Sequence, residues 1–172
     1  MADNYNFEKE LYEAISMLEF WDDGKANATD GGVVFQVPAI SGVEDFTATG
    51  LVSLDLREEE QPVEFLSIDL VLARNADPSK ETIIKQKLYD LNLGLKEGMF
   101  YMDDEKNFCF ETNFPIIRGD VVGAMQLFIA QYMEIINYLD GVYPYILRVI
   151  AHPEVADFSE YIAVMLGDES LQ

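Results

Sequence analysis

Two neighbouring segments of this 172-residue chain alternate apolar or small residues with polar ones at a period of two. These positions are Phe46, Ala48, Gly50, Val52, Leu54 and Leu56 in the first segment, and Leu66, Ile68, Leu70 and Leu72 in the second. Because successive side chains of a strand point to opposite faces, residues 46–56 and 63–73 each predict a strand with one buried face. The connection between them has hairpin length, so the strands are expected to pair antiparallel.

The amino-terminal part predicts one helix and one more strand. Apolar residues recur at helical spacing over residues 7–21, with Leu11 and Leu18 on the expected core face. Residues 24–32 are polar and rich in glycine, which predicts a loop. A strand over residues 33–37 follows this loop.

The second half predicts two helices and two strands. Asp77 and Pro78 supply a cap and a first-turn proline for a helix that ends near Asn92. Short strands are expected over residues 99–102 and 107–114, joined by the charged run Asp103-Asp104-Glu105-Lys106. A long helix then begins after Gly119-Asp120.

Together the elements predict an α+β protein in which helices flank an antiparallel sheet. The expected order is α-β-β-β-α-β-β-α, followed by a short C-terminal helix over residues 157–166. We expect one domain over residues 1–172, with a core in residues 1–150 and a helical appendage in residues 151–172.

The last long helix has an unusually wide apolar side. Its small or polar residues fall on one narrow strip, and Phe128 and Tyr132 lie at the centre of the apolar side, together with Val121 and Leu139. One edge of that side carries Val122, Ile129, Met133 and Ile136. A sheet alone does not cover so wide a stripe, so a second surface is expected over this edge. It is either the tail, through Phe158, Ile162 and Met165, or another protein chain. Pro144 is expected to end or kink the helix.

The net charge of −21 limits the kinds of partner that the protein can have. Nucleic acid and anionic membranes are bound through Lys and Arg, which are scarce in this chain, so neither is expected as a direct partner. The first residues contain neither a signal sequence nor a bilayer-spanning run, which predicts a cytoplasmic protein.

The sequence contains no recognisable catalytic motif. Cys109 lies between two phenylalanines and is expected to be a small core residue, although His152 is a conceivable partner for a nucleophile. The acidic residues around Gly24 and those of the run Asp103-Asp104-Glu105 lack the ligand spacing of a calcium loop. We therefore expect no catalytic residues, no cofactor and no resident metal.

Three short motifs resemble those of a known family. They are LYDLN at residues 88–92, GMFYMD at residues 98–103 followed by the strand at 108–114, and Tyr143-Pro144 in a long helix. This order is similar to that of bacterial YbjN-type sensory-transduction regulators, whose fold resembles that of type III secretion chaperones. The resemblance covers about half of the chain. It implies a small acidic protein, often homodimeric, that presents an apolar surface to a protein segment.

The functional expectation combines this resemblance with the wide helix and the missing catalytic motifs. We expect a non-catalytic, protein-binding adaptor or chaperone-like module whose contact residues include Val122, Ile129, Met133 and Ile136. A homodimer through the same residues is a further possibility. The alternative is an enzyme or a small-ligand-binding domain whose site has no motif in the sequence.

Overall fold

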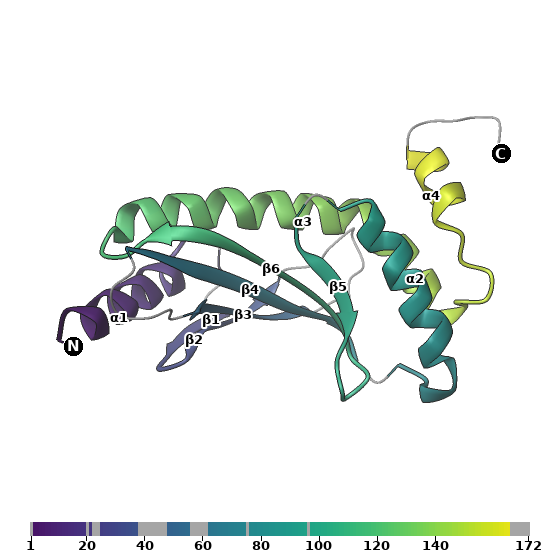
Figure 1. The fold of residues 1–172 in the computed structure, drawn as a ribbon, viewed down its shortest axis with the longest axis horizontal. Helices are drawn as coiled ribbons and strands as arrows, with labels where there is room; N and C mark the ends of the chain where they lie inside the picture. The colour runs from purple at the N-terminus through teal and green to yellow at the C-terminus, as the bar shows by residue number, and fades with distance from the viewer. Residues whose placement is uncertain are drawn as a thin grey trace.

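The computed structural model confirms the predicted α+β class and element order (Figure 1). It describes residues 2–19, 21, 25–37, 48–55, 62–74, 76–95 and 97–165. The helices are α1 (Ala2–Ser16), α2 (Glu81–Leu93), α3 (Val121–Ala151) and α4 (Phe158–Met165), with a short 3-10 helix η1 (Pro78–Lys80). The strands are β1 (Ala26–Thr29), β2 (Gly32–Val37), β3 (Ala48–Asp55), β4 (Val63–Ala73), β5 (Met99–Met102) and β6 (Phe108–Ile117).

The six strands form one antiparallel sheet in the order β1-β2-β3-β4-β6-β5. The first four strands follow one another as a meander, and β6 then inserts between β4 and β5. Helix α2 lies in the connection from β4 to β5, which is why it is found at the β5 end of the sheet (Figure 1).

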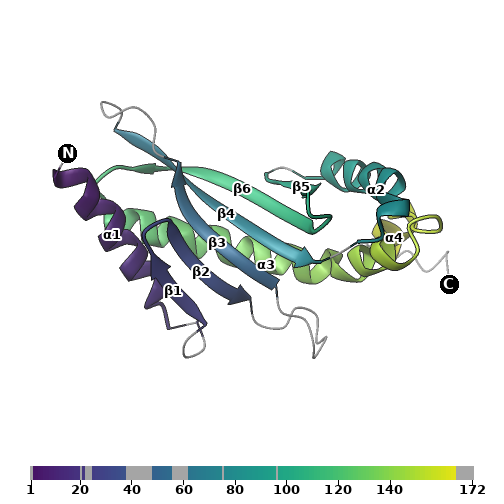
Figure 2. The same ribbon diagram turned by 90° about the horizontal axis from the view of Figure 1, so that it is seen from below.

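Helix α3 runs along one face of the sheet, and α1 contacts both α3 and the β1–β2 hairpin. From the other side, strands β3, β4 and β6 lie in front of α3, and no described helix crosses them (Figure 2). A two-layer molecule of this kind buries one sheet face and leaves the other to solvent or to a partner.

The predicted core positions confirm the register of the central strands. Val52, Ile68 and Leu70 are at most 1% exposed on the helix side of the sheet. Leu11 of α1 and Phe128 of α3 are fully buried in the same cluster. The prediction for Leu72 is confirmed as well, whereas Leu54 and Leu18 are half-buried against the core. Phe46 and Leu56 lie outside the described residues.

Strand β1 corrects the prediction of a loop over residues 24–32. Its sequence, ANAT, has no apolar alternation, so pattern reasoning alone misses it. The strand forms because the Asp30-Gly31 turn folds it back onto β2, where Ala26 pairs with Phe35. Gly32 has a φ of +143°, and a Cβ there would lie 2.2 Å from the carbonyl oxygen of Val52.

The first helix is shorter than predicted, because α1 ends at Ser16 and not near Asp22. Leu18 and Trp21 remain on the core side because two backbone bonds continue the turn, Leu18 N–H to Ile15 O and Trp21 N–H to Leu18 O. The Trp21 indole N–H also donates to Ile15 O, at 2.7 Å. Tight turns therefore place Leu18 and Trp21 on the same side as the core residues of α1, as a longer helix would have done.

Pro144 does not end the last long helix, since α3 continues to Ala151. Buried contacts on both sides of the proline hold the helix together: Tyr143, Tyr145 and Ile146 are each at most 3% exposed. Tertiary packing therefore outweighs the backbone hydrogen bond that an interior proline removes.

Asn92, at the end of α2, ties that helix to strand β5. Its side-chain N–H donates to Phe100 O at 2.8 Å, and its side-chain oxygen accepts from Phe100 N–H at 2.7 Å. The two bonds occupy both backbone groups that Phe100 turns away from β6. Asn92 thereby closes the outer edge of a strand that would otherwise present unpaired amides.

Replacing Asn92 with Ala is expected to lower the free energy of unfolding by about 1–3 kcal/mol, because two half-buried backbone groups lose their partners. Urea denaturation followed by circular dichroism measures this loss. Leu93→Ala is the control, since Leu93 is 70% exposed and its truncation should change stability little. Equal losses of stability in the two variants would show that the hydrogen bonds between Asn92 and Phe100 do not stabilise the fold.

Candidate functional site

The four residues expected at a protein contact lie along one edge of α3, and we call them the α3 edge row. They are Val122, Ile129, Met133 and Ile136. Val122 is 66% and Met133 47% exposed, whereas Ile129 and Ile136 are half-buried and pack against the core. The predicted centre of the helix is confirmed at Phe128, Tyr132 and Leu139, which are buried, whereas Val121 is half-buried. The α3 edge row therefore lies at the boundary between the buried core and the solvent-exposed surface.

The described part of the tail lies elsewhere on α3. The rings of Phe158 and Tyr161 of α4 contact the ring of Tyr145 at a tilt, with ring centroids 5.3 and 5.5 Å from it. Ile162 is 40% exposed, and the side chain of Met165 lies outside the described residues. Helix α4 therefore packs on the carboxyl-terminal part of α3 (Figure 1). Val122 and Met133 remain exposed.

Cys109 and His152 are not brought together. The Cys109 thiol lies 3.8 Å from Asp103 Oδ2 and 3.7 Å from Asn107 O, while His152 Nδ1 lies 3.6 Å from Glu154 at the end of α3. Burial, followed by the Asp103 carboxylate, raises the pKa of the thiol to about 11. Cys109 is buried as expected, but it stays protonated and is a poor nucleophile.

The acidic turns do not form an ion site in the part of the chain that the structure describes. Asp103 accepts from the backbone N–H and the side-chain N–H of Asn107, each at 2.8 Å, so it closes the β5–β6 hairpin. Asp22 and Asp23 lie outside the described residues. No group of three or more His, Cys, Asp or Glu among the described residues is arranged to hold a metal.

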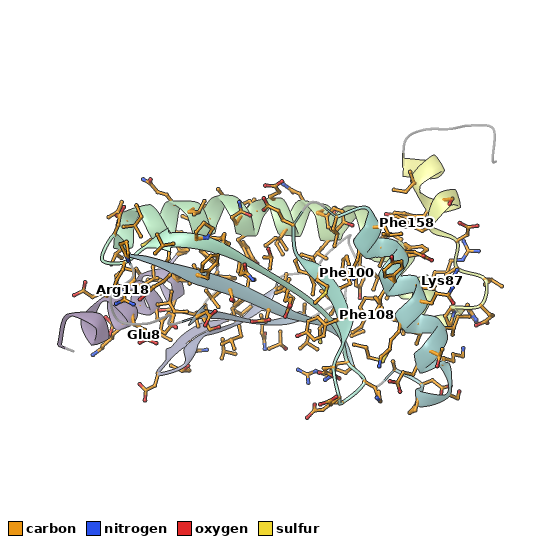
Figure 3. All side chains as sticks on the ribbon, viewed as in Figure 1. Glu8, Lys87, Phe100, Phe108, Arg118 and Phe158 are labelled. Carbon is orange, nitrogen blue, oxygen red and sulfur yellow. The ribbon has the colours of Figure 1, made fainter. Side chains whose placement is uncertain are left out.

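A buried ion pair at the other end of the sheet was missed by sequence reasoning. Arg118 Nε lies 2.5 Å from Glu64 Oε1, and the two side chains are 14% and 2% exposed. Figure 3 shows Arg118 at the end of the molecule where α1 and Glu8 lie. The signal was present in the alternation of β4, because Glu64 occupies the same face as Leu66 and Ile68.

The open face of the sheet carries two carboxyl groups on directly opposed residues, Asp69 of β4 and Glu111 of β6. Burial, and then the charge of Glu111, raises the pKa of Asp69. Tyr101 lies on the same face, and its pKa is raised to about 12 by burial and by the surrounding Cys109, Asp69 and Glu111. Like charges in opposed positions destabilise a sheet.

Asp69→Asn is expected to raise the free energy of unfolding at pH 7 by up to about 1 kcal/mol, because it removes this repulsion. The raised pKa of Asp69 means that the folded protein binds its proton more tightly than the unfolded chain does. The destabilisation from Asp69 is therefore fully present above the pKa of the folded state, and it is relieved as the pH falls through that pKa toward the lower pKa of the unfolded chain. Melting curves at several pH values should show that acidification raises the melting temperature less in Asp69→Asn than in the native protein. An identical pH dependence of the two proteins would contradict this account.

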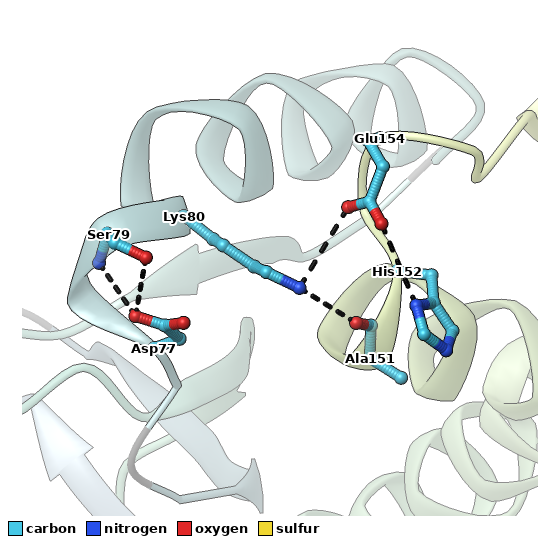
Figure 4. A network of polar contacts seen from close by, with 6 residues as sticks. All are labelled: Asp77, Ser79, Lys80, Ala151, His152 and Glu154. Atoms are coloured by element: carbon cyan, nitrogen blue, oxygen red, sulfur yellow. Dashed lines mark hydrogen bonds and ion pairs between the residues drawn. The ribbon is translucent and has the colours of Figure 1, made fainter.

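Lys80 links the carboxyl end of α3 to the start of α2 (Figure 4). Its ammonium donates to Ala151 O at 3.0 Å and lies 3.9 Å from Glu154 Oε2. Asp77 caps the preceding turn as predicted, accepting from the Ser79 N–H at 2.9 Å and from its hydroxyl at 2.7 Å. These contacts have a structural role at the surface and do not form a reactive site.

Comparison with known proteins does not assign the chain to a group: no family model matches it, and no curated protein matches it. Among the described helices, none combines the length and apolar character required to cross a bilayer. The fold and surface define a two-layer α+β protein with an acidic exterior and an exposed apolar edge on its longest helix.

Proposed function

We propose that the protein is a non-catalytic, cytoplasmic adaptor or chaperone-like module that binds another protein through the α3 edge row. The observation that carries this proposal is the exposure of Val122 and Met133, 66% and 47%, on a helix whose neighbouring edge residues enter the core. Large apolar side chains in a row on a rigid helix are typical of a surface that a partner covers.

The arrangement of the edge row suits a helix or an extended segment as the bound element. The four positions lie within one sector of α3, so their side chains follow one line along the helix. Ile129 and Ile136 are held by the core and Met133 is flexible, which combines a fixed platform with an adaptable contact. The similarity in element order to YbjN-type regulators and secretion chaperones supports the same kind of role.

Self-association is one form that this binding can take, because a two-fold axis lets the same row cover itself. A stable homodimer buries upward of about 1,000 Å² in total. Met133→Asp is expected to dissociate such a dimer without unfolding it, since Met133 is already 47% exposed. Sedimentation equilibrium measures the mass, and Leu93→Asp, which adds the same charge at a 70% exposed apolar position of α2, is the matched control.

Affinity purification from native cytosol tests the function itself. The tagged protein is expected to recover one protein in stoichiometric amount, and Met133→Asp should lose it while Leu93→Asp retains it. A partner that binds both variants equally would place the contact on another surface. Recovery of a small molecule and no protein would favour the alternative class, a ligand-binding domain.

A further inference from the structure

A cavity of about 330 Å³ lies between α3, strand β6 and the α2–β5 connection. Phe110, Ile135 and Tyr138 form apolar walls, and Thr112 lines it from β6. Glu97 and Glu134 also line the cavity, and no Lys, Arg or His does. Cavities of this size, with apolar walls and a few polar groups, are typical sites for small molecules.

The cavity opens where strand β5 stops short of β6. The last paired residues are Met99 and Glu111, although β6 continues to Ile117 (Figure 2). Gly98 precedes β5 with a φ of +81°, and a Cβ there would lie 2.6 Å from the ring of Phe110. Only glycine therefore fits at this position beside Phe110, whose ring lines the cavity.

Thr112 is a polar residue of the cavity lining whose side chain forms no hydrogen bond with a described residue. Thr112 is 5% exposed. Its side chain points toward α3, because it lies two residues from Phe110 and from Phe114, which are buried on the same face of β6. The hydroxyl is not one of the fully buried polar atoms that lack a partner, so it can be reached from the cavity that Thr112 lines and can bond a group that enters there.

We propose that this cavity binds a small amine: an ammonium group on an apolar body of about ten non-hydrogen atoms. The body fills the space between Phe110, Ile135 and Tyr138, the Thr112 hydroxyl supplies a hydrogen bond, and the carboxylates of Glu97 and Glu134 attract the cation. Neither carboxylate has an ion pair with a described residue. An anionic ligand of the same shape is repelled.

This site is separate from the α3 edge row. Ile135 and Tyr138 lie on the side of α3 that faces β6, whereas Met133 and Val122 lie on the side away from it. Ligand binding therefore goes beyond the proposed adaptor function and does not depend on it.

NMR titration of the ¹⁵N-labelled full chain with 3-phenylpropylamine tests the proposal, and 3-phenylpropan-1-ol is the neutral probe of matched shape. The amine is expected to produce saturable shifts around Thr112 and Glu134 and to bind about tenfold more tightly than the alcohol, because its hydrogen bonds are charge-assisted. Glu134→Gln should reduce this preference. Asp104→Asn changes the charge equally but lies outside the cavity lining, so it should not.

Thr112→Val separates binding from folding. Removing a hydroxyl that bonds no described residue should leave the melting temperature unchanged or higher, yet the amine should bind several-fold more weakly. Equal affinities for the two probes, shifts that do not saturate, or shifts centred on other residues would overturn the proposal. If Thr112→Val fails to fold, the preference for the amine over the alcohol in Glu134→Gln and in Asp104→Asn still tests the proposal.

Discussion

Replacing Val52 with Asp is expected to abolish the native fold at room temperature. Val52 is fully buried at the centre of β3, where it pairs with Val33 of β2 and Ile68 of β4. An aspartate there would place a charge without a partner between the sheet and the helices. Such a charge costs about 4 kcal/mol or more, which is most of the stability of an ordinary domain.

The adjacent residue provides the control for this change. Ser53 lies on the open face of the same strand, so Ser53→Asp adds the same charge to the same strand on the side of the solvent. Circular dichroism and urea denaturation should show an unfolded or nearly unfolded Val52→Asp variant and a folded Ser53→Asp variant. A Val52→Asp protein with native stability would refute the assignment of the buried face.

The second large effect is expected at the buried ion pair of Glu64 and Arg118. Arg118→Leu should lower the free energy of unfolding by about 3–5 kcal/mol, because it leaves the Glu64 carboxylate buried without its cation. The Oε2 atom of Glu64 already accepts no hydrogen bond from a described residue. The loss is therefore far greater than that of a surface ion pair, which contributes up to about 1 kcal/mol.

The double variant Glu64→Leu/Arg118→Leu distinguishes a buried charge from lost packing. It should recover most of the stability lost in Arg118→Leu, because replacing both partners of a buried pair with apolar side chains is often neutral. Chemical denaturation of the two single variants and the double variant gives the coupling between the residues. Additive losses would show that the pair does not act as a unit.

The fold could be predicted because its central strands are half-buried. In β3 and β4 the alternation of apolar and polar residues reflects burial directly, so Val52, Ile68 and Leu70 were assigned to the correct face. The cap at Asp77 was predictable for a similar reason, since the requirement for a side-chain acceptor is local.

Features that depend on contacts between elements, and not on the pattern within one element, could not be predicted in this way. Strand β1 exists only because β2 lies next to it, and its own residues contain no strand pattern. The path of α3 through Pro144 depends on side chains packed around it. The bridge from Asn92 to Phe100 joins two elements whose separation no local pattern fixes.

The α3 edge row and the cavity beside Thr112 also differ in how far local sequence patterns could predict them. Helical spacing was enough to group Val122, Ile129, Met133 and Ile136, but it could not reveal that Ile129 and Ile136 reach the core while the other two are exposed. The cavity beside Thr112 has no sequence signature, because it arises where β5 ends before β6 does. Only the fold brings its residues together.

The most direct test of the α3 edge row places a photocrosslinking residue, p-benzoylphenylalanine, at position 133 in the full chain and irradiates living cells. The exposed side chain of Met133 allows this replacement without disturbing the core. Position 93, a 70% exposed apolar position on α2, is the control. The account predicts one discrete protein adduct from position 133 and little from position 93. Equal adducts from both positions, or no adduct from position 133, would contradict it.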